Sequence, residues 1–114
     1  MGDNIFSKII AKQIPADIVY EDDRVVAFRD IHPQAPVHVL IVPRQAMVQV
    51  DDARPDEEAL LGHLLFVAGE LARREGIVGS GYRLVINNGA QAGQSVPHLH
   101  VHLLGGRALG WPPG

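Results

Sequence analysis

Three histidines occupy alternate positions near the carboxyl end of the chain, within residues 97–104 (PHLHVHLL). Successive side chains of a β-strand point to opposite faces, so this alternation predicts a strand with His98, His100 and His102 on one face. Imidazoles stabilise a core poorly because each brings two nitrogens that need partners once water is excluded. The row therefore predicts that one face of the strand packs and that the other face carries chemistry.

Three interpretations of this histidine row compete. A solvated strand face is disfavoured, because exposed polar rows rarely consist of histidine alone. A metal site is the second, since neutral imidazoles two residues apart on a strand can share a zinc or copper ion, given a further ligand and an open position. The third is a nucleophilic histidine whose neighbours fix its tautomer and carry protons. The residues before the row favour the third.

The segment before the row, residues 87–95 (NNGAQAGQS), is rich in small residues and ends in the hydroxyl of Ser95. Backbone amides of such a loop can approach an anion closely, as they do in loops that bind phosphate. This loop suits a phosphoryl group beside a histidine better than it suits a closed metal cage. The sequence therefore predicts a site that handles phosphate and holds no metal or other cofactor.

Together these segments resemble the histidine-triad (HIT) nucleotide-binding family, whose pattern is His-x-His-x-His followed by apolar residues. The residues GQS at 93–95 precede the row, as in that pattern. The segments LGGR at 104–107 and WPPG at 111–114 resemble the Hint branch, the nucleoside phosphoramidases, rather than the dinucleoside polyphosphate hydrolases. The resemblance spans nearly the whole chain, from Ile5 onwards. It departs from the family at Pro97, Ala46 and His32, and none of these is the expected nucleophile.

The resemblance implies a role for each site residue. His100 would attack phosphorus, His102 would hold phosphate oxygens, and Ser95 would contact the leaving group. His38 and His98 would complete the proton transfers. A purine nucleotide would be the ligand. Asp30 would bind its ribose hydroxyls, and Asn87 would lie near the phosphate and sugar. The other nucleotide contacts would be Ile5, Phe6, Ile9, Phe28, Ile31, Gly93 and Gln94.

Without the resemblance, several of these residues have ordinary structural interpretations. Asp30 follows an expected strand and is typical of a turn residue that binds nearby amides. His38 lies in the apolar run 37–42, where a lone histidine is usually a satisfied core residue. The stripe that contains Ile5 and Ile9 is typical of a helix face packed on a core. The histidine row changes the balance for His38, because a fourth imidazole on a central strand can relay a proton.

The rest of the chain predicts an α+β fold with a mostly antiparallel sheet of about five strands. A short helix is expected near residues 4–12, and a long helix near 55–75 begins at a proline followed by acidic residues. His63 in the long helix is expected to face solvent. The strands are expected at 18–20, 25–29, 37–42, 82–87 and in the histidine row. The helix–strand alternation of a parallel sheet is absent from this pattern.

Length and composition constrain the class of protein further. We expect 114 residues to form one domain, 1–114, whose burial would benefit from a partner. The chain has no cysteine, which excludes disulfides and fits a cytoplasmic location. Its formal charge of −3, with scattered Lys and Arg, gives no electrostatic surface for nucleic acid. No segment approaches the ~20 apolar residues of a membrane span.

The leucine-rich stripe of the expected helix 55–75 also predicts a homodimer. Such a stripe can serve one core and still leave an edge to bury against a second copy, and two-fold pairing is the commonest oligomer symmetry. The resembled family is dimeric as well. The tail 107–114 is proline-limited and carries the single Trp of the chain, so we expect it to lie extended near the partner's active site.

The reaction predicted from these residues is hydrolysis of a nucleoside 5′-phosphoramidate. A covalent nucleotidyl-histidine would form first, and the products would be a purine nucleoside monophosphate and an amine. Enzymes that expel polyphosphate commonly bind Mg²⁺ through carboxylates, and the sequence shows no acidic cluster near its histidines. Dinucleoside polyphosphate hydrolysis is the enzymatic alternative. A zinc-dependent or purely nucleotide-binding regulatory protein is the alternative of another class.

Overall fold

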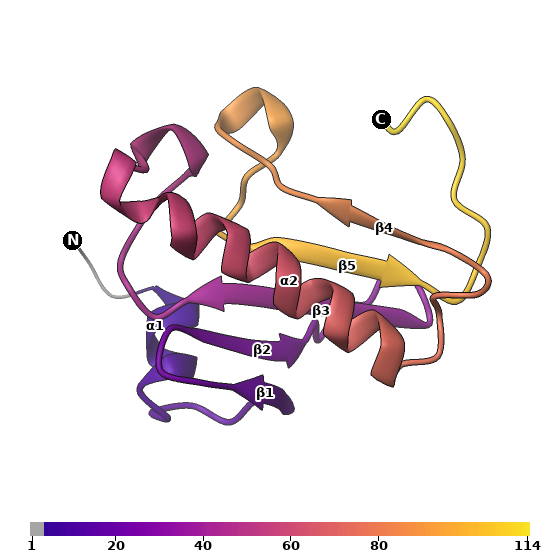
Figure 1. Ribbon diagram of the computed structural model, residues 1–114, viewed down its shortest axis with the longest axis horizontal. Coiled ribbons are helices and arrows are strands. Elements are labelled where there is room, and N and C mark those ends of the chain that lie inside the picture. The colour runs from indigo at the N-terminus through magenta and orange to yellow at the C-terminus, as the bar shows by residue number, and fades with distance from the viewer. Residues whose placement is uncertain (1–3) are drawn as a thin grey trace.

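The fold is a single five-stranded sheet with one long helix on one face, shown in Figure 1 as a computed structural model that describes residues 4–114. Every neighbouring pair of strands is antiparallel, and the order across the sheet is β1-β2-β3-β5-β4. The predicted α+β class is therefore confirmed. The strands are β1 Ile18–Glu21, β2 Val25–Arg29, β3 Val37–Pro43, β4 Tyr82–Val85 and β5 Val101–Gly105.

Both predicted helices are present. The short one, α1, spans Ile5–Ile10, and the long one, α2, spans Glu58–Arg74. The predicted start at Pro55 is a 3₁₀ turn, η2 Pro55–Glu57, that leads directly into α2. Two further 3₁₀ turns are η1 Val50–Asp52 and η3 Ala90–Ala92. Within residues 4–114, neither helix is long and apolar enough to cross a membrane.

The end of α2 is fixed by a Schellman motif. Gly76 adopts a left-handed conformation with φ of 71°, which costs glycine no Cβ clash. Its amide donates to the carbonyl of Arg73, and the amide of Ile77 donates to the carbonyl of Ala72. The chain is thereby turned back towards β4.

The two faces of β3 explain why its sequence is nearly all apolar. Val39 and Ile41 face the large core formed with α2, whereas Leu40 and Val42 face a smaller cluster with α1. Figure 1 shows α2 lying along one face of the sheet and α1 at its end. A strand covered on both faces must be apolar on both, so His38 at its start is the exception that needs partners.

The strand that contains the histidine row begins later than predicted. β5 starts at Val101, opposite Ile41 of β3, so His98 and His100 precede the strand. The amide of Leu99 donates instead to the carbonyl of Met47, 2.7 Å away, in the segment that follows β3. The ladder ends here because Pro43, the last residue of β3, has no N–H to donate.

His63 does not face solvent as predicted. Its Nε2 lies 2.7 Å from Oδ2 of Asp22, in the β1–β2 turn beneath α2. The same carboxylate accepts hydrogen bonds from the hydroxyl of Tyr20 and from the amides of Arg24 and Val25. Burial acts to raise the pKa of Asp22, but these four donors together hold it well below its usual range. His63 therefore ties the helix to the hairpin.

Candidate active site

A cavity of about 260 Å³ opens on the face of the sheet that carries α1. Most of its wall is apolar and comes from α1, the segment after it and β2. Its polar part includes Ser95, His100 and His102. The lining residues are Ile5, Phe6, Ile9, Ile14, Pro15, Ala16, Phe28, Arg29, Asp30, Ile31, His32, Leu40, Ser95, Val96, His100 and His102.

Many of the predicted site residues meet in this cavity, although they come from four separate parts of the chain. The structure brings together Ile5, Phe6, Ile9, Phe28, Asp30, Ile31, Ser95, His100 and His102. His38 and His98 are buried behind the wall. The ring of His38 binds that of His102, and the backbone carbonyl of His98 accepts from His100. Asn87, Gly93 and Gln94 do not belong to the wall.

Gln94 has a different set of partners from those expected of a nucleotide contact. Its Oε1 accepts the amide of Gly89 at 2.9 Å, and its Nε2 donates to the carbonyls of Val48 and Val96. Gly93 beside it has a φ of 87°, a conformation that favours glycine. The side chain of Gln94 is occupied in holding its own loop, so these two residues shape the loop that delivers Ser95.

The first hydrogen-bond chain of the site runs through His98. Its Nε2 lies 2.8 Å from the carbonyl oxygen of Pro43, which can only accept, so Nε2 carries the proton. The carbonyl of His98 in turn lies 2.7 Å from Nδ1 of His100. By the same logic Nδ1 of His100 is protonated, and its Nε2 keeps a free lone pair. The chain ends in a nucleophilic nitrogen.

The second chain runs through His38 and ends in a donor. The amide of Gln34 donates to Nδ1 of His38 at 3.0 Å, which leaves the proton of His38 on Nε2. That Nε2 lies 2.9 Å from Nδ1 of His102, so His102 carries its proton on Nε2. This buried N–H has no hydrogen-bond partner among the described residues. A buried unpaired donor is costly unless a ligand accepts from it.

All four imidazoles are held neutral. Burial lowers the pKa of His38, His98 and His100. Burial, together with the charges that His100 and His38 would carry, lowers the pKa of His102 to about 4. The rings of His100 and His102 lie 4.9 Å apart. The site therefore presents a lone pair beside an N–H donor, a combination that can attack an electrophile and hold an oxyanion.

Asp30 stands next to this pair of histidines. Its Oδ1 accepts the amide of His32 at 2.8 Å, the turn contact predicted for such a residue, and its Oδ2 lies 3.5 Å from Nε2 of His38. One carboxylate oxygen is therefore anchored, and the other faces the imidazoles. The sequence placed this carboxylate in a loop far from the row and gave no sign that it would meet His38.

Asp30, His38 and His102 also have potential metal-ligand atoms within 4.8 Å of one another. Two imidazole nitrogens on one tetrahedral zinc, each at about 2.0–2.1 Å, would be about 3.3 Å apart. Nε2 of His38 and Nδ1 of His102 are only 2.9 Å apart, a hydrogen-bond distance. These two nitrogens would have to separate to bind one metal, so their geometry suits a shared proton better.

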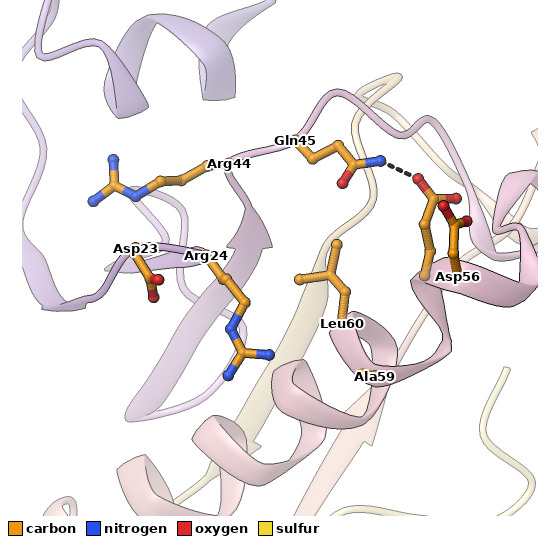
Figure 2. A pocket seen from close by; sticks show the side chains of 8 residues that line it. Asp23, Arg24, Arg44, Gln45, Asp56, Ala59 and Leu60 are labelled. Atoms are coloured by element: carbon orange, nitrogen blue, oxygen red, sulfur yellow. Dashed lines mark hydrogen bonds between the residues drawn. The ribbon is translucent and has the colours of Figure 1, made fainter.

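A second cavity, of about 300 Å³, lies at the start of α2 and is shown in Figure 2. Glu57 there accepts hydrogen bonds from Gln45 and from the amide of Arg54. Its wall mixes carboxylates with guanidinium groups and contains no histidine. This cavity therefore marks where η2 is tied to the segment after β3, and it lacks the nucleophile of the first.

Several residues of the active-site cavity were missed in the sequence. Ile14, Pro15 and Ala16 follow α1 and look like a loop, while Leu40 and Val96 look like ordinary core residues. The backbone groups that set the tautomers, on Gln34 and Pro43, leave no side-chain signal at all. Only Leu40 could have been predicted to line the cavity, because the alternation of side chains in β3 places it on the same face as His38.

Comparison with known proteins identifies the family of this chain. A family model described as the HIT domain matches residues 11–109. An uncharacterized HIT-like protein of Synechocystis sp. is 60% identical over 112 residues, which are 98% of this chain and 97% of that protein.

Solved structures of HIT proteins have the same fold. A HIT family hydrolase from Legionella pneumophila is 47% identical, with a TM-score of 0.96 over 98% of this chain and 100% of that one. A histidine triad nucleotide-binding protein from Candida albicans is 32% identical, with a TM-score of 0.80 over 95% of this chain and 82% of that one. The chain belongs to the HIT family.

Proposed function

We propose that the protein hydrolyses nucleoside 5′-phosphoramidates to a purine nucleoside monophosphate and an amine. The observation that carries the proposal is the pair of unlike nitrogens, the lone pair on Nε2 of His100 beside the unpaired N–H on Nε2 of His102. Attack on phosphorus needs the first, and charge on the nonbridging oxygens needs the second. Both face an apolar cavity with room for a base.

In the first step His100 attacks phosphorus through Nε2, and the phosphorus–nitrogen bond to the amine breaks. The amine leaves with a proton, and Ser95 lies in the wall where it can contact the leaving nitrogen. The N–H of His102 holds a phosphate oxygen as charge shifts. In the second step water attacks the nucleotidyl-histidine and the phosphorus–Nε2 bond breaks. The proton that the water gives up replaces the one that the amine carried away, and the monophosphate is released with His100 restored.

His98 has a different role in this proposal from the proton carrier first expected. Its Nε2–H is committed to Pro43 and its carbonyl to His100. A ring so committed orients the nucleophile and transfers no proton. His38 keeps a place in proton movement, because its hydrogen bond to His102 connects the N–H at the phosphate to Asp30.

The apolar part of the cavity supports a purine base. Phe6 and Phe28 pack edge to face, with ring centroids 5.4 Å apart, and give a rigid wall. Ile31 is 76% exposed and Ile5 is 46% exposed, although both line the cavity. Large apolar side chains left in water at a cavity wall favour a flat apolar ligand that covers them. Asp30 beside them would accept hydrogen bonds from the ribose hydroxyls.

The relatives support the class of reaction. The Legionella protein is called a hydrolase and the Candida protein a nucleotide-binding protein, and both share this fold. A turnover screen tests the proposal by comparing AMP and GMP amidates with dinucleoside polyphosphates, with and without a chelator. We expect amidates to be turned over fastest and the chelator to have no effect. Faster turnover of polyphosphates would contradict the proposal. So would one equivalent of tightly bound zinc whose removal by the chelator abolishes activity.

We also propose that the protein is a two-fold symmetric dimer. Phe66, on the outer face of α2, is 64% exposed, and further exposed apolar side chains follow near it and along β4. β4 is an edge strand, whose unpaired backbone groups need cover or a partner. The exposed side chains are Leu65, Phe66, Val78, Tyr82 and Ile86. Light scattering should give about twice the chain mass, and Phe66→Glu should give a monomer.

The carboxyl tail is proposed to act in that dimer. Arg83 donates to the carbonyl of Gly110 and lies 5.9 Å from the ring centroid of Trp111. Trp111 itself is 81% exposed, which leaves its large apolar face free for a second copy. We propose that the tail lies near the partner's active site. Deletion of residues 108–114 should then change the ranking of leaving groups more than the affinity for mononucleotides.

We propose, finally, that residues 1–114 act as one HIT domain in the cytoplasm. The side-by-side placement of β3 and β5 joins the two halves of the chain in one sheet. The cysteine-free composition fits a reducing compartment. Cell fractionation with an antibody to the protein tests the location.

A further inference from the structure

Asn4 stands where the amino end of α1 meets the histidine row. Its Oδ1 accepts the amide of Ser7 at 2.9 Å, and the hydroxyl of Ser7 accepts the amide of Asn4 at 2.9 Å, which makes a capping box. Because Oδ1 is committed to an N–H group, the other end of the amide must be the NH₂ group. That group lies 3.5 Å from Nδ1 of His98.

His98 needs a partner at this nitrogen. The ring is 2% exposed, and its proton is already placed on Nε2 by the carbonyl of Pro43. Nδ1 is therefore a buried lone pair, and buried acceptors without a donor are disfavoured. The amide of Asn4 supplies that donor at the long end of the hydrogen-bond range. The proposed reaction does not itself use this contact between Asn4 and His98.

The same corner joins α1 to the nucleophile through packing. The ring of Phe6, two residues after Asn4, lies edge to face with both His98 and His100, at centroid distances of 6.2 and 5.0 Å. Phe6 also belongs to the cavity wall. A shift of α1 would therefore move the wall and His100 together, and Asn4 is the polar contact that fixes the start of that helix against His98.

We propose that Asn4 is a positioning residue for the reaction. It fixes α1 against His98 and keeps His98 a neutral imidazole with its proton on Nε2, so that the backbone of His98 holds His100 with its lone pair towards phosphorus. The effect on turnover rests on the proposed function. The effect on the tautomer of His98 does not.

The neutrality of His98 matters because His100 lies close to it. A positive charge on His98 would repel a proton on His100 and so lower the pKa of His100, in addition to the effect of burial. A nitrogen beside a cation is a weaker nucleophile, because the lone pair is stabilised. The contacts of His98 include the N-cap residue Asn4, Phe6 of α1, and Pro43 at the end of β3, none of which is ionisable, and the ionisable ring of His100.

The variant Asn4→Asp tests this role sharply. Aspartate caps a helix as well as asparagine does, so α1 keeps its cap. Its second oxygen, however, replaces the NH₂ group and draws a proton onto Nδ1 of His98. We expect ¹⁵N spectra of the imidazoles at neutral pH to show His98 neutral in the wild type and doubly protonated in the variant. The kcat should fall by about tenfold or more, as when partners that orient an imidazole are lost, with little change in KM.

Ser7→Ala is the matched control, because it removes half of the capping box and leaves the amide of Asn4 in place. It should lower the melting temperature without changing the His98 signals or kcat. Asn4→Ser is a second variant, which keeps a capping hydroxyl but no group that reaches His98; it should lower kcat without charging the ring.

Wild-type His98 signals in Asn4→Asp, or equal kcat losses in Ser7→Ala and Asn4→Ser, would overturn the role of Asn4. A wild-type protein inactive on all amidates would overturn the proposed function alone. The spectra need no substrate and would still decide the tautomer of His98.

Discussion

The two faces of the sheet use histidine in opposite ways. On the face covered by α2, His63 pairs with the carboxylate of Asp22, a contact between an imidazole and a charged group. On the other face, the hydrogen-bond partners of His38, His98 and His100 are backbone groups or another imidazole, and the carboxylate of Asp30 lies farther away, 3.5 Å from Nε2 of His38. Backbone and imidazole partners permit a buried neutral ring. The contact with Asp22 serves packing, and the neutral pairing keeps a reactive lone pair.

The two faces also differ in how well they are filled. The α2 face holds a cluster of buried apolar residues that includes Leu64, Leu71 and Ile41. The α1 face holds a smaller cluster and the open cavity. Stability is therefore expected to depend mainly on the first face and chemistry on the second.

The largest effect is expected at His100. His100→Ala removes the nucleophile and should reduce turnover by about 10⁴-fold or more, because the covalent route is lost. The affinity for mononucleotides should remain, since the base and ribose contacts are intact. In the wild type, mass spectrometry of the quenched reaction should detect an adduct of nucleotide mass, and peptide mapping should place it on His100. An adduct on another residue, or a fully active variant, would contradict the assignment.

The α2 face is tested by Leu64→Ala, which truncates one of its buried side chains. The free energy of unfolding should fall by about 2–5 kcal/mol, because a cavity replaces the lost contacts. Urea titration measures this change. The kcat of the folded variant should stay close to the wild-type value. Arg73→Ala, on the exposed side of the same helix, is the control and should change stability by about 0.5 kcal/mol or less.

On the cavity face, Asp30→Ala should weaken binding of ribonucleotides by about 1.5–3 kcal/mol, as expected for hydrogen bonds to a charged group. Analogues without the ribose hydroxyls should lose little, because they never made these contacts. Calorimetric titration with both ligands separates the two cases. Equal losses for both would return Asp30 to the turn role shown by its hydrogen bond to the amide of His32.

Acid should reveal the neutral histidines. The pKa of His102 is about 4 in the folded protein, against about 6.5 for an ordinary histidine. Between these values the unfolded chain binds a proton that the folded protein does not, so the free energy of unfolding falls as pH decreases from about 6.5 towards 4. His102 should contribute about 3 kcal/mol of this loss, at about 1.4 kcal/mol for each unit between the two pKa values.

Urea titrations across that pH range measure the loss, and His102→Asn should reduce its slope. Leu64→Ala is the control from the other face: it lowers stability at every pH and should leave the slope unchanged, because it removes no ionisable group. Identical slopes for His102→Asn and the wild type would show that the imidazole titrates normally in the fold.

Most of the fold follows from local patterns in the sequence. Helical spacing predicted α2, and short apolar runs predicted the strands. Strands that follow one another in the chain pair in three cases, whereas β3 pairs with the distant β5. What local patterns could not supply was contact between distant segments. His63 and Asp22 are 41 residues apart, and nothing in the helix marked His63 as different from a surface residue.

The site divides in the same way. The side chains that carry chemistry are chemically distinctive, so His100, His102 and Ser95 stood out as a group. The groups that decide their protonation are backbone carbonyls and amides, on residues such as Pro43 and Gln34, which look alike at every position. Gln94 illustrates a related point: an amide side chain suits a ligand and a loop equally well, and its three contacts with backbone groups could not be read from the sequence.

The neutral imidazoles of the cavity affect the rates of ligand association and release. Arg29, the guanidinium among the lining residues, is held by both carboxylate oxygens of Glu75, and the chain as a whole carries a formal charge of −3. An anionic ligand is therefore not steered inwards by a positive field, and its association rate should vary little with ionic strength. The same lack of a free positive charge would let a phosphate product depart without breaking an ion pair, as the proposed turnover requires.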